Sequence, residues 1–428
     1  MRRALLVLGA ALTALLAAFG ISQLQMGAAQ ADSNDAPRFS VDPSWPKALP
    51  HNWQIGAVPG IAVDKDDNIW IVQRPRTLTS DERGASNFEP GAGAVLDGAL
   101  RPQGSISDCC LPAPSIMQFD PKGNLLRAWG GPVDPSKCVE PACQWPNTEH
   151  GIYVDHNMNV WTGGQAGRAV LKFTADGTFL LQIGERSTPV TGGASNVTTG
   201  GHGGTPLLGQ PADMEVDPET NELYIADGYT NHRVIVVDAV TGLYRRHWGA
   251  YGQNPVTDGL VGPYIKNQPP APNFRNPVHA VRITKDGLVY VADRTNDRIQ
   301  VFDKKKVGAP CAPNGQVPNN CGFLGEIIVA PDTLGPGSTW DIDVSADKHQ
   351  KFLFTADGSN NYVWTLLRRT GAILGTFGRN GRSAGQFHWV HNMAVDSKGN
   401  IYTAEVDTGK RVQKFTPRGK SKDDDDDD

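Results

Sequence analysis

One pattern recurs six times along the chain, and it restricts the possible fold more than any other feature. Within residues 274–303, two runs of alternating apolar residues, 281–283 and 288–291, flank the turn 285–287, and a third run covers 299–302. Alternation broken by an Asp-Gly turn is typical of antiparallel strands joined by hairpins. The other five copies cover residues 60–130, 150–184, 212–249, 340–378 and 391–419.

The copies predict a single all-β domain. A complete copy holds four strands, and in the fourth copy the last strand is expected at 323–329. Six four-stranded units in series are typical of a six-bladed β-propeller. The sixth copy ends after three strands, so we expect residues 38–46 to add the fourth and close the ring, which removes exposed strand edges. The predicted propeller spans residues 32–419.

The N-terminus has the features of a secretory signal peptide. Arg2 and Arg3 precede the apolar run 4–21, and Ala-Gln-Ala at 29–31 forms a small-residue cleavage site. We therefore expect cleavage of residues 1–31 and an exported protein, periplasmic or secreted. The alternative is an uncleaved anchor, because the apolar run is near the length that spans a bilayer. No later run is that long, so we expect no membrane span after cleavage.

Composition limits the partners. A formal net charge of −5 argues against nucleic acid, and we expect a monomer. The acidic tail, residues 420–428, is predicted to be disordered.

Three inserts, 75–114, 185–208 and 250–272, are longer than a blade needs. Inserts of this length are lids or binding loops, or else mobile connections.

Six cysteines in an exported chain predict disulfides. Cys311 and Cys321 bracket a loop rich in Pro, Asn and Gly, and we expect them to pair. The other four are expected to form two more bridges whose connectivity the sequence leaves open: Cys109, Cys110, Cys138 and Cys143. A zinc–thiolate site is the alternative, although two adjacent cysteines are poorly spaced as ligands.

Histidine occupies one register in every second copy. Aligning the copies on the end of their first strands brings six residues to the same position: Pro59, His150, Ala212, His279, Trp340 and His391. Alternate blades of a six-bladed ring lie a third of a turn apart, and first strands line the channel, so the three imidazoles are expected to converge. Three neutral histidines that leave one position open are typical of catalytic zinc (Zn²⁺), although iron, copper and nickel also suit imidazole. The alternative for each histidine is a hydrogen-bonded channel residue.

The ends of the second strands lead to the same face as the histidines. Arg74, Tyr229 and Arg294 lie there, in copies one, three and four. Two guanidinium groups near a metal suit a small-molecule or peptide substrate that carries a carboxylate. A phenol between a metal and two cations can act as a base. The alternatives are surface salt bridges for the arginines and a half-buried loop residue for the tyrosine.

The chain resembles NHL-type six-bladed propellers, and among them the peptidyl-α-hydroxyglycine α-amidating lyases. The motifs that carry this resemblance are residues 226–233, residues 291–302 and the histidines at three blade starts. The resemblance extends over nearly all of the mature chain. It implies that the three histidines bind zinc, that Tyr229 is the catalytic tyrosine, and that Arg74 and Arg294 hold the substrate.

The resemblance also implies a structural calcium (Ca²⁺) in the channel. Its ligands would be the main-chain carbonyls of Ile61 and Ile152 and the side chain of Asn392, where the family has aspartate. An amide oxygen binds calcium more weakly than a carboxylate. Trp389 stands where the family has a methionine near the substrate, which implies that Trp389 contacts substrate here.

The activity that the resemblance implies is a lyase reaction. A carbinolamide C–N bond, or the bond of a related α-hydroxy substrate, would be cleaved to give an amide and glyoxylate. One alternative is a metal-dependent lactonase or esterase, but such propeller sites are usually rich in carboxylates, whereas this channel is rich in histidine. The other is a non-catalytic NHL-type binding propeller, because one fold supports both roles.

Overall fold

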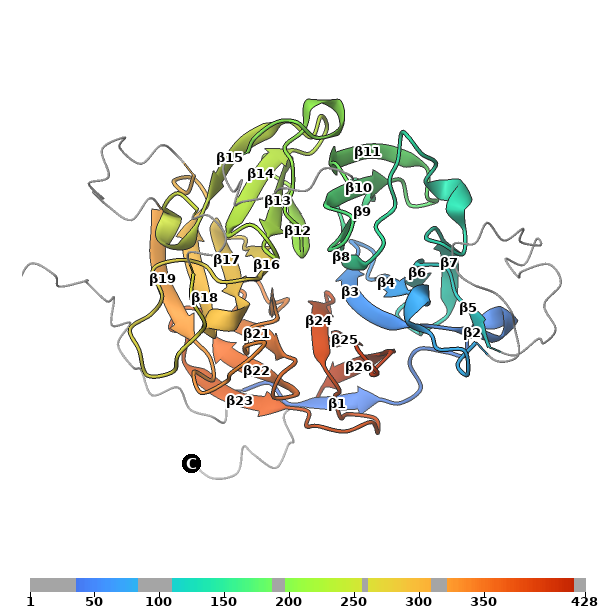
Figure 1. Ribbon diagram of the computed structural model, residues 1–428. Coiled ribbons are helices and arrows are strands. Elements are labelled where there is room, and N and C mark those ends of the chain that lie inside the picture. The colour runs from blue at the N-terminus through green and yellow to red at the C-terminus, as the bar shows by residue number, and fades with distance from the viewer. Residues whose placement is uncertain (1–35, 84–109, 187–196, 256–260, 309–321, 419–428) are drawn as a thin grey trace, which may run out of the picture. The chain divides into compact units, whose positions relative to one another are not determined.

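Six antiparallel sheets, each of four strands, surround a central axis in the computed structural model of the protein (Figure 1). The structure describes residues 36–83, 110–186, 197–255, 261–308 and 322–418. Within these ranges the fold is the predicted all-β six-bladed propeller. Among the described residues, no helix has both the length and the apolar character to cross a membrane. The predicted signal peptide, 1–31, and the acidic tail, 420–428, lie outside the described residues.

The first three blades follow the predicted copies. Blade one consists of β3 (Ala57–Val63), β4 (Ile69–Arg74), β6 (Ile116–Phe119) and β7 (Leu125–Trp129). Blade two consists of β8 (Glu149–Val154), β9 (Val160–Gly164), β10 (Ala169–Phe173) and β11 (Phe179–Gly184). Blade three consists of β12 (Asp213–Asp217), β13 (Glu222–Asp227), β14 (Arg233–Asp238) and β15 (Tyr244–Trp248).

The other three blades complete the ring. Blade four consists of β16 (Val278–Ile283), β17 (Leu288–Asp293), β18 (Arg298–Asp303) and β19 (Phe323–Ile328). Blade five consists of β20 (Asp341–Val344), β21 (Phe352–Asp357), β22 (Tyr362–Leu367) and β23 (Ile373–Phe377). Blade six consists of β24 (Val390–Val395), β25 (Ile401–Glu405), β26 (Arg411–Pro417) and the N-terminal β1 (Phe39–Asp42).

The ring closes as predicted. β1 pairs antiparallel with β26, from Phe39 opposite Pro417 to Asp42 opposite Lys414. The N-terminal strand is therefore the outer strand of the last blade (Figure 1). Main-chain hydrogen bonds across this pair satisfy an edge that the sixth blade would otherwise expose.

The turns between the first and second strands of blades one and two are built by the same set of side-chain contacts. Asp64 Oδ1 accepts hydrogen bonds from the main-chain N–H groups of Asp66 and Asn68, and Asp64 Oδ2 accepts one from the indole of Trp70 at 2.8 Å. In blade two, Asp155 bonds the indole of Trp161 in the same way at 2.9 Å. Aspartate favours such turns because its side chain replaces main-chain acceptors.

The core lies between neighbouring blades rather than in one central cluster. Ile61 and Ile71 of blade one, for example, pack in one buried cluster with Ala394 and Tyr402 of blade six. The large tryptophans of the first three blades, Trp70, Trp161 and Trp248, are fully buried. Apolar contact between blades removes this surface from water and stabilises the ring.

Several local features were not predicted from the sequence. A two-stranded parallel sheet joins β2 (Trp53–Gln54) to β5 (Leu111–Pro112). Short 3-10 helices form at η2 (Pro50–Asn52), η3 (Pro75–Thr77), η4 (Pro135–Lys137), η5 (His202–Gly204), η6 (Ala250–Gly252) and η7 (Arg294–Asn296).

Cys138 and Cys143 form a disulfide. This is one of the connectivities that the sequence left open. Cys110 is also disulfide-bonded. Cys109 and the predicted pair Cys311 and Cys321 lie outside the described residues.

Candidate metal centre

The three aligned histidines meet in the channel. His150, His279 and His391 lie on β8, β16 and β24, the first strands of blades two, four and six, which face the central axis (Figure 1). All three are buried, and one ring nitrogen from each lies within 4.8 Å of the others. The predicted convergence of the imidazoles is confirmed.

A local irregularity of the strand pairing accompanies each histidine. The pairing register shifts between Glu149 and Ile152 in blade two, across His279 in blade four, and across His391 in blade six. A β-bulge inserts an extra residue into one strand and so re-aims its side chain. The first strand of blade one has the same shift between Ala57 and Gly60, around the aligned Pro59, whereas β12 and β20 of blades three and five pair without one.

Main-chain carbonyls of the next blade orient the imidazoles. Each Nδ1 donates to one carbonyl oxygen: His150 to Ala212 at 2.7 Å, His279 to Trp340, and His391 to Pro59 at 2.7 Å. A carbonyl oxygen can only accept, so the proton of each ring is on Nδ1. Each Nε2 therefore presents a lone pair to the centre, the usual outer contact of a metal-binding histidine.

The environment keeps these rings uncharged. Burial lowers the pKa of each of the three histidines well below its usual value. The positive charges of Arg74 and Arg294 lower the pKa of His150 and His391 further. Neutral imidazole is the form that binds a metal ion.

Tyr229 lies against two of the lone pairs. Its hydroxyl oxygen is 2.9 Å from His150 Nε2 and 3.2 Å from His279 Nε2. The single phenolic proton cannot serve both nitrogens at once. The three Nε2 lone pairs thus face a single phenolic proton, so at least one of them lacks a hydrogen-bond donor. A metal cation would satisfy all three, and the set of nitrogen ligands therefore fits a metal ion.

A glycine allows Tyr229 to come this close. Gly228 lies against the main chain of β16, where an added Cβ atom would be 1.9 Å from the carbonyl oxygen of Val278. The turn of blade three therefore rests directly on the strand that carries His279. No other residue type fits at Gly228 without moving one of the two blades.

This close approach gives a stability prediction. Gly228→Ala is expected to lower the free energy of unfolding by about 1–3 kcal/mol, the usual cost of overpacking. Chemical unfolding measures the effect. The matched control is Gly325→Ala on the outer strand of blade four, where an added Cβ meets no atom within 4 Å. Equal stability of the two variants would contradict the close approach.

The predicted arginines are held by main-chain oxygens. Arg74 Nε donates to the carbonyl of Glu149 at 2.6 Å, and Arg294 Nε donates to the carbonyl of Pro336 at 2.9 Å. Arg294 Nη1 also donates to the Tyr229 hydroxyl at 3.3 Å. Burial lowers the pKa of both arginines, but an arginine remains protonated. Hydrogen bonds from Nε to main-chain carbonyls thus fix both guanidinium groups beside the histidines.

Two tryptophans flank the centre. The guanidinium of Arg294 lies 4.3 Å from the ring centre of Trp340, whose ring also meets His391 edge-on at 5.5 Å. Trp389 packs perpendicular to Trp340 at 5.1 Å and has a left-handed φ of 53°. A bulky residue in that backbone region is strained, and such strain gathers at functional sites. Trp340 was aligned with the histidines but not predicted as a site residue.

The calcium ligands implied by the resemblance lie together beyond the histidines. Ile61, Ile152 and Asn392 line one hollow in the channel. The amide oxygen of Asn392 accepts the N–H of Ile61 at 2.6 Å, and its amide nitrogen donates to Asp341 at 2.7 Å. Both polar atoms of Asn392 are thus engaged in hydrogen bonds.

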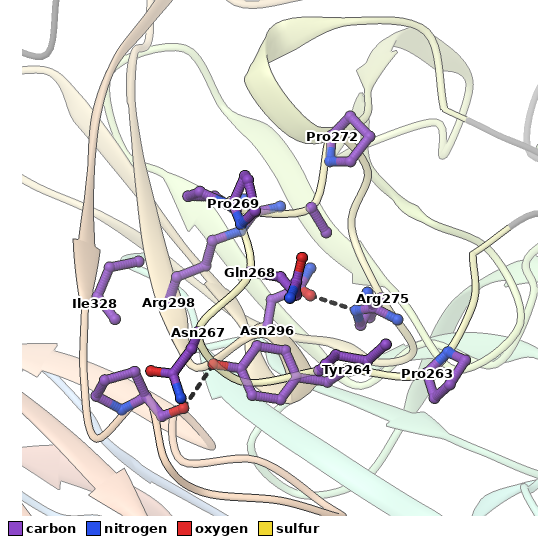
Figure 2. Close-up of a pocket in the computed structure, with 14 residues that line it drawn as sticks. Pro263, Tyr264, Asn267, Gln268, Pro269, Pro272, Arg275, Asn296, Arg298 and Ile328 are labelled. Carbon is purple, nitrogen blue, oxygen red and sulfur yellow. Dashed lines mark hydrogen bonds between the residues drawn. The ribbon is translucent and has the colours of Figure 1, made fainter.

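A separate hollow of about 420 Å³ lies on the surface of blade four, and the histidines are not part of its lining. It is bounded by residues 263–272, with Ile328 and Arg298 on the side of the sheet (Figure 2). Tyr264 closes one end by donating its hydroxyl to the carbonyl of Pro331 at 2.7 Å. None of the predicted site residues lines it.

Among known proteins, the chain is similar to NHL repeat proteins and to amidating enzymes. The NHL repeat family matches residues 276–302, which form the inner strands of blade four. NHL repeat-containing protein 3 of Homo sapiens is 30% identical over 328 residues, which cover 71% of this chain and 73% of that protein.

The chain is also similar to amidating enzymes. Peptidyl-glycine alpha-amidating monooxygenase B of Xenopus laevis is 25% identical over 277 residues, which cover 64% of this chain but 25% of that protein. Peptidyl-alpha-hydroxyglycine alpha-amidating lyase 1 of Drosophila melanogaster is 24% identical over 320 residues, which cover 71% of this chain and 53% of that protein. The chain thus spans about a quarter of the length of the monooxygenase.

Proposed function

The chain belongs to the family of NHL repeat-containing proteins, and from this premise we propose that it is a metal-dependent lyase that acts on an N-acyl-α-hydroxyglycine. One observation carries the proposal. The hydroxyl of Tyr229 lies within 3.2 Å of two of the three converging Nε2 atoms, and Arg294 donates to that same hydroxyl. The named activity of the Drosophila melanogaster relative agrees with this assignment.

The metal would be held by His150, His279 and His391. We propose zinc, and imidazole also suits iron, copper and nickel. When bound, such an ion supplies a positive charge that stabilises a negatively charged substrate oxygen.

Tyr229 is the proposed base. Its phenolate oxygen takes the proton of the substrate hydroxyl, and the C–N bond then breaks as the hydroxyl-bearing carbon becomes the aldehyde carbon of glyoxylate. The proton taken by Tyr229 passes to the leaving nitrogen, which departs as a neutral amide, so atoms and charge balance. The N–H group of Arg294 donates to the phenol oxygen at 3.3 Å and so orients it.

The arginines are the proposed carboxylate ligands. Main-chain carbonyls hold the Nε atoms of Arg74 and Arg294 and so fix the two side chains in place. The terminal N–H groups are proposed to bind the substrate carboxylate. Guanidinium groups fixed in this way hold a substrate carboxylate with little loss of entropy on binding. Trp389 is the proposed contact for the acyl part of the substrate.

We further propose that the protein is exported, periplasmic or secreted, and works as a monomer without nucleic acid. The basic and apolar N-terminal sequence supports export. The disulfide between Cys138 and Cys143 supports an oxidising compartment.

Metal analysis and a glyoxylate assay test the function together. The protein is purified without a histidine tag, its transition-metal content is measured, and glyoxylate release from an N-acyl-α-hydroxyglycine is followed. About one transition-metal ion per chain and metal-dependent glyoxylate release are expected. A protein with neither would be a binding propeller, and one that hydrolyses lactones but releases no glyoxylate would be a hydrolase.

A conservative change at Arg294 tests substrate binding. Arg294→Lys keeps the charge but loses the planar fork and the stacking on Trp340, so kcat/KM is expected to fall about 10- to 100-fold with metal content unchanged. Steady-state kinetics measure the change. The matched control is Arg245→Lys, because Arg245 is an exposed arginine paired with Asp238. An Arg294→Lys enzyme as active as the control would contradict the substrate-binding role.

The calcium that the resemblance implies does not fit Asn392 as its ligand. The amide oxygen of this residue already accepts the N–H of Ile61 at 2.6 Å. The carbonyls of Ile61 and Ile152 remain beside the hollow, but the side chain that should complete the set is engaged elsewhere. No step of the reaction is therefore assigned to calcium.

A further inference from the structure

The hollow of about 420 Å³ on blade four has no part in the proposed reaction, yet it has the features of a binding site. One wall is the insert, residues 263–272. The opposite wall is the sheet, to which β18 contributes Arg298 and β19 contributes Ile328 (Figure 2). The volume lies within the range that is typical of pockets for small molecules.

The insert wall is tied down and stiff. The Tyr264 hydroxyl donates to the carbonyl of Pro331 at 2.7 Å, and Lys266 Nζ lies 3.4 Å from a carboxylate oxygen of Asp332. Proline fixes φ and carries no main-chain N–H. Four prolines of the insert line the hollow: Pro263, Pro269, Pro270 and Pro272. A wall of this kind loses little conformational freedom when a ligand binds.

Two isoleucines leave apolar surface uncovered at the hollow. The exposed fraction is 59% for Ile265 of the insert and 40% for Ile328 of β19, and both residues line the hollow. Aliphatic surface gathered around a concavity marks a place where a ligand or partner makes contact. An apolar ligand seated there would remove this surface from water, which is favourable.

Arg275 brings a guanidinium group to the same hollow without a full set of acceptors (Figure 2). Its Nε donates to the side-chain oxygen of Asn296. Neither terminal nitrogen has a hydrogen-bond partner among the described residues, and Nη1 is buried. Burial lowers the pKa of Arg275, but an arginine remains protonated. A buried N–H group without an acceptor is costly, so the group favours an added acceptor.

The carboxylates near Arg275 are engaged elsewhere. Arg298, the other arginine of the hollow, lies 2.7 Å from a carboxylate oxygen of Asp293 and 3.2 Å from one of Glu326. The second oxygen of Asp293 accepts the main-chain N–H of Arg275 at 3.0 Å. Arg275 thus forms no ion pair within the part of the chain that the structure describes. One unpaired guanidinium group suits one carboxylate, which it can bind through two parallel N–H groups.

We propose that the hollow of blade four binds a small carboxylic acid with an apolar body. Arg275 holds the carboxylate, and Ile265 and Ile328 cover the body. The three histidines, Tyr229 and Arg294 do not line the hollow, so this site is separate from the metal centre and does not depend on the proposed lyase reaction.

Binding of 3-phenylpropionate tests the proposal, with 3-phenylpropanamide as the uncharged match. Ligand-observed NMR titrations of the full protein measure both dissociation constants. We expect a Kd of about 1 mM or tighter for the acid. The amide should bind at least about 10-fold more weakly, because it loses the hydrogen bonds between charged groups. No binding of the acid, or equal binding of acid and amide, would overturn the proposal.

Variants locate the bound acid. Arg275→Gln and Ile328→Glu should each weaken its binding at least about 10-fold, the first by removing the cation and the second by adding a like charge. Ile328→Glu changes an exposed side chain, so it decides if Arg275→Gln does not fold. The matched control is Ile373→Glu, because Ile373 is 47% exposed on β23, the outer strand of blade five. Unchanged binding in Ile328→Glu would overturn the proposal.

Two further measurements separate this site from its alternatives. His279→Ala should bind 3-phenylpropionate as wild type does, whatever its effect on metal and activity. Binding lost in this variant would place the acid at the metal centre and overturn the proposal. N-acetylphenylalanine that bound more than about 10-fold tighter than 3-phenylpropionate would replace the small acid by the end of a peptide chain.

Discussion

Tyr229→Phe is expected to lower kcat for glyoxylate release by about 10²- to 10⁴-fold, the usual contribution of a positioned base. Phenylalanine keeps the ring in its place between His150 and His279 but removes the oxygen that lies 2.9 and 3.2 Å from their Nε2 atoms. The imidazoles keep their carbonyl partners, so metal content should not change. Steady-state kinetics with metal analysis of the same samples measure both quantities.

The control for this variant is Tyr264→Phe. It removes the same oxygen from a tyrosine whose hydroxyl bonds the carbonyl of Pro331 at the surface of blade four (Figure 2). This control should turn over substrate at the wild-type rate. If Tyr229→Phe did the same, the base would have to be another group. If it lost metal as well as activity, Tyr229 would be a part of the metal centre rather than a base.

His279→Ala is expected to weaken zinc binding by more than about 100-fold and to abolish activity. Losing an outer hydrogen bond of a metal site already costs about 10- to 100-fold in affinity, and this variant removes a ligand. The two remaining imidazoles cannot enclose the ion from three sides. Competition with a chromogenic chelator measures the affinity, and zinc should raise the Tm of wild type but not of the variant.

The matched histidine is His156, which is exposed in the turn after β8. His156→Ala should bind zinc as wild type does. Zinc affinity in His279→Ala equal to that of the control would mean that the three imidazoles do not share one ion. The proposed function would then fail together with the metal centre.

The ring and the positions of the histidines could be predicted because both follow from periodicity. Alternation of period two defines each strand, and the repeat places His150, His279 and His391 at one register. The bulges were not predicted, since a bulge is a difference in pairing between two strands that no residue type marks. It becomes visible only when His279 is seen outside the pairing that joins Val278 to Asp293 and Ala280 to Ala292.

The groups that orient the histidines could not be predicted from the sequence either. Ala212, Trp340 and Pro59 act through main-chain carbonyls, which every residue carries, so their side chains give no common signal. The role of Asn392 was assigned by resemblance, and the contacts it makes with Ile61 and Asp341 point to a different one. The pairing of Cys138 with Cys143 was one of several that the spacing allowed.

The pairing of β1 with β26 has a consequence for the synthesis and folding of the protein. A ribosome makes Phe39 near the start of synthesis and Pro417 near its end, yet these residues face each other in one sheet. His391, the last of the three imidazoles, lies in that same final blade. A nascent or truncated chain that stops before blade six therefore lacks both the strand pairing that closes the ring and the third histidine of the proposed metal centre. The proposed metal site can then form only after the whole polypeptide has been made.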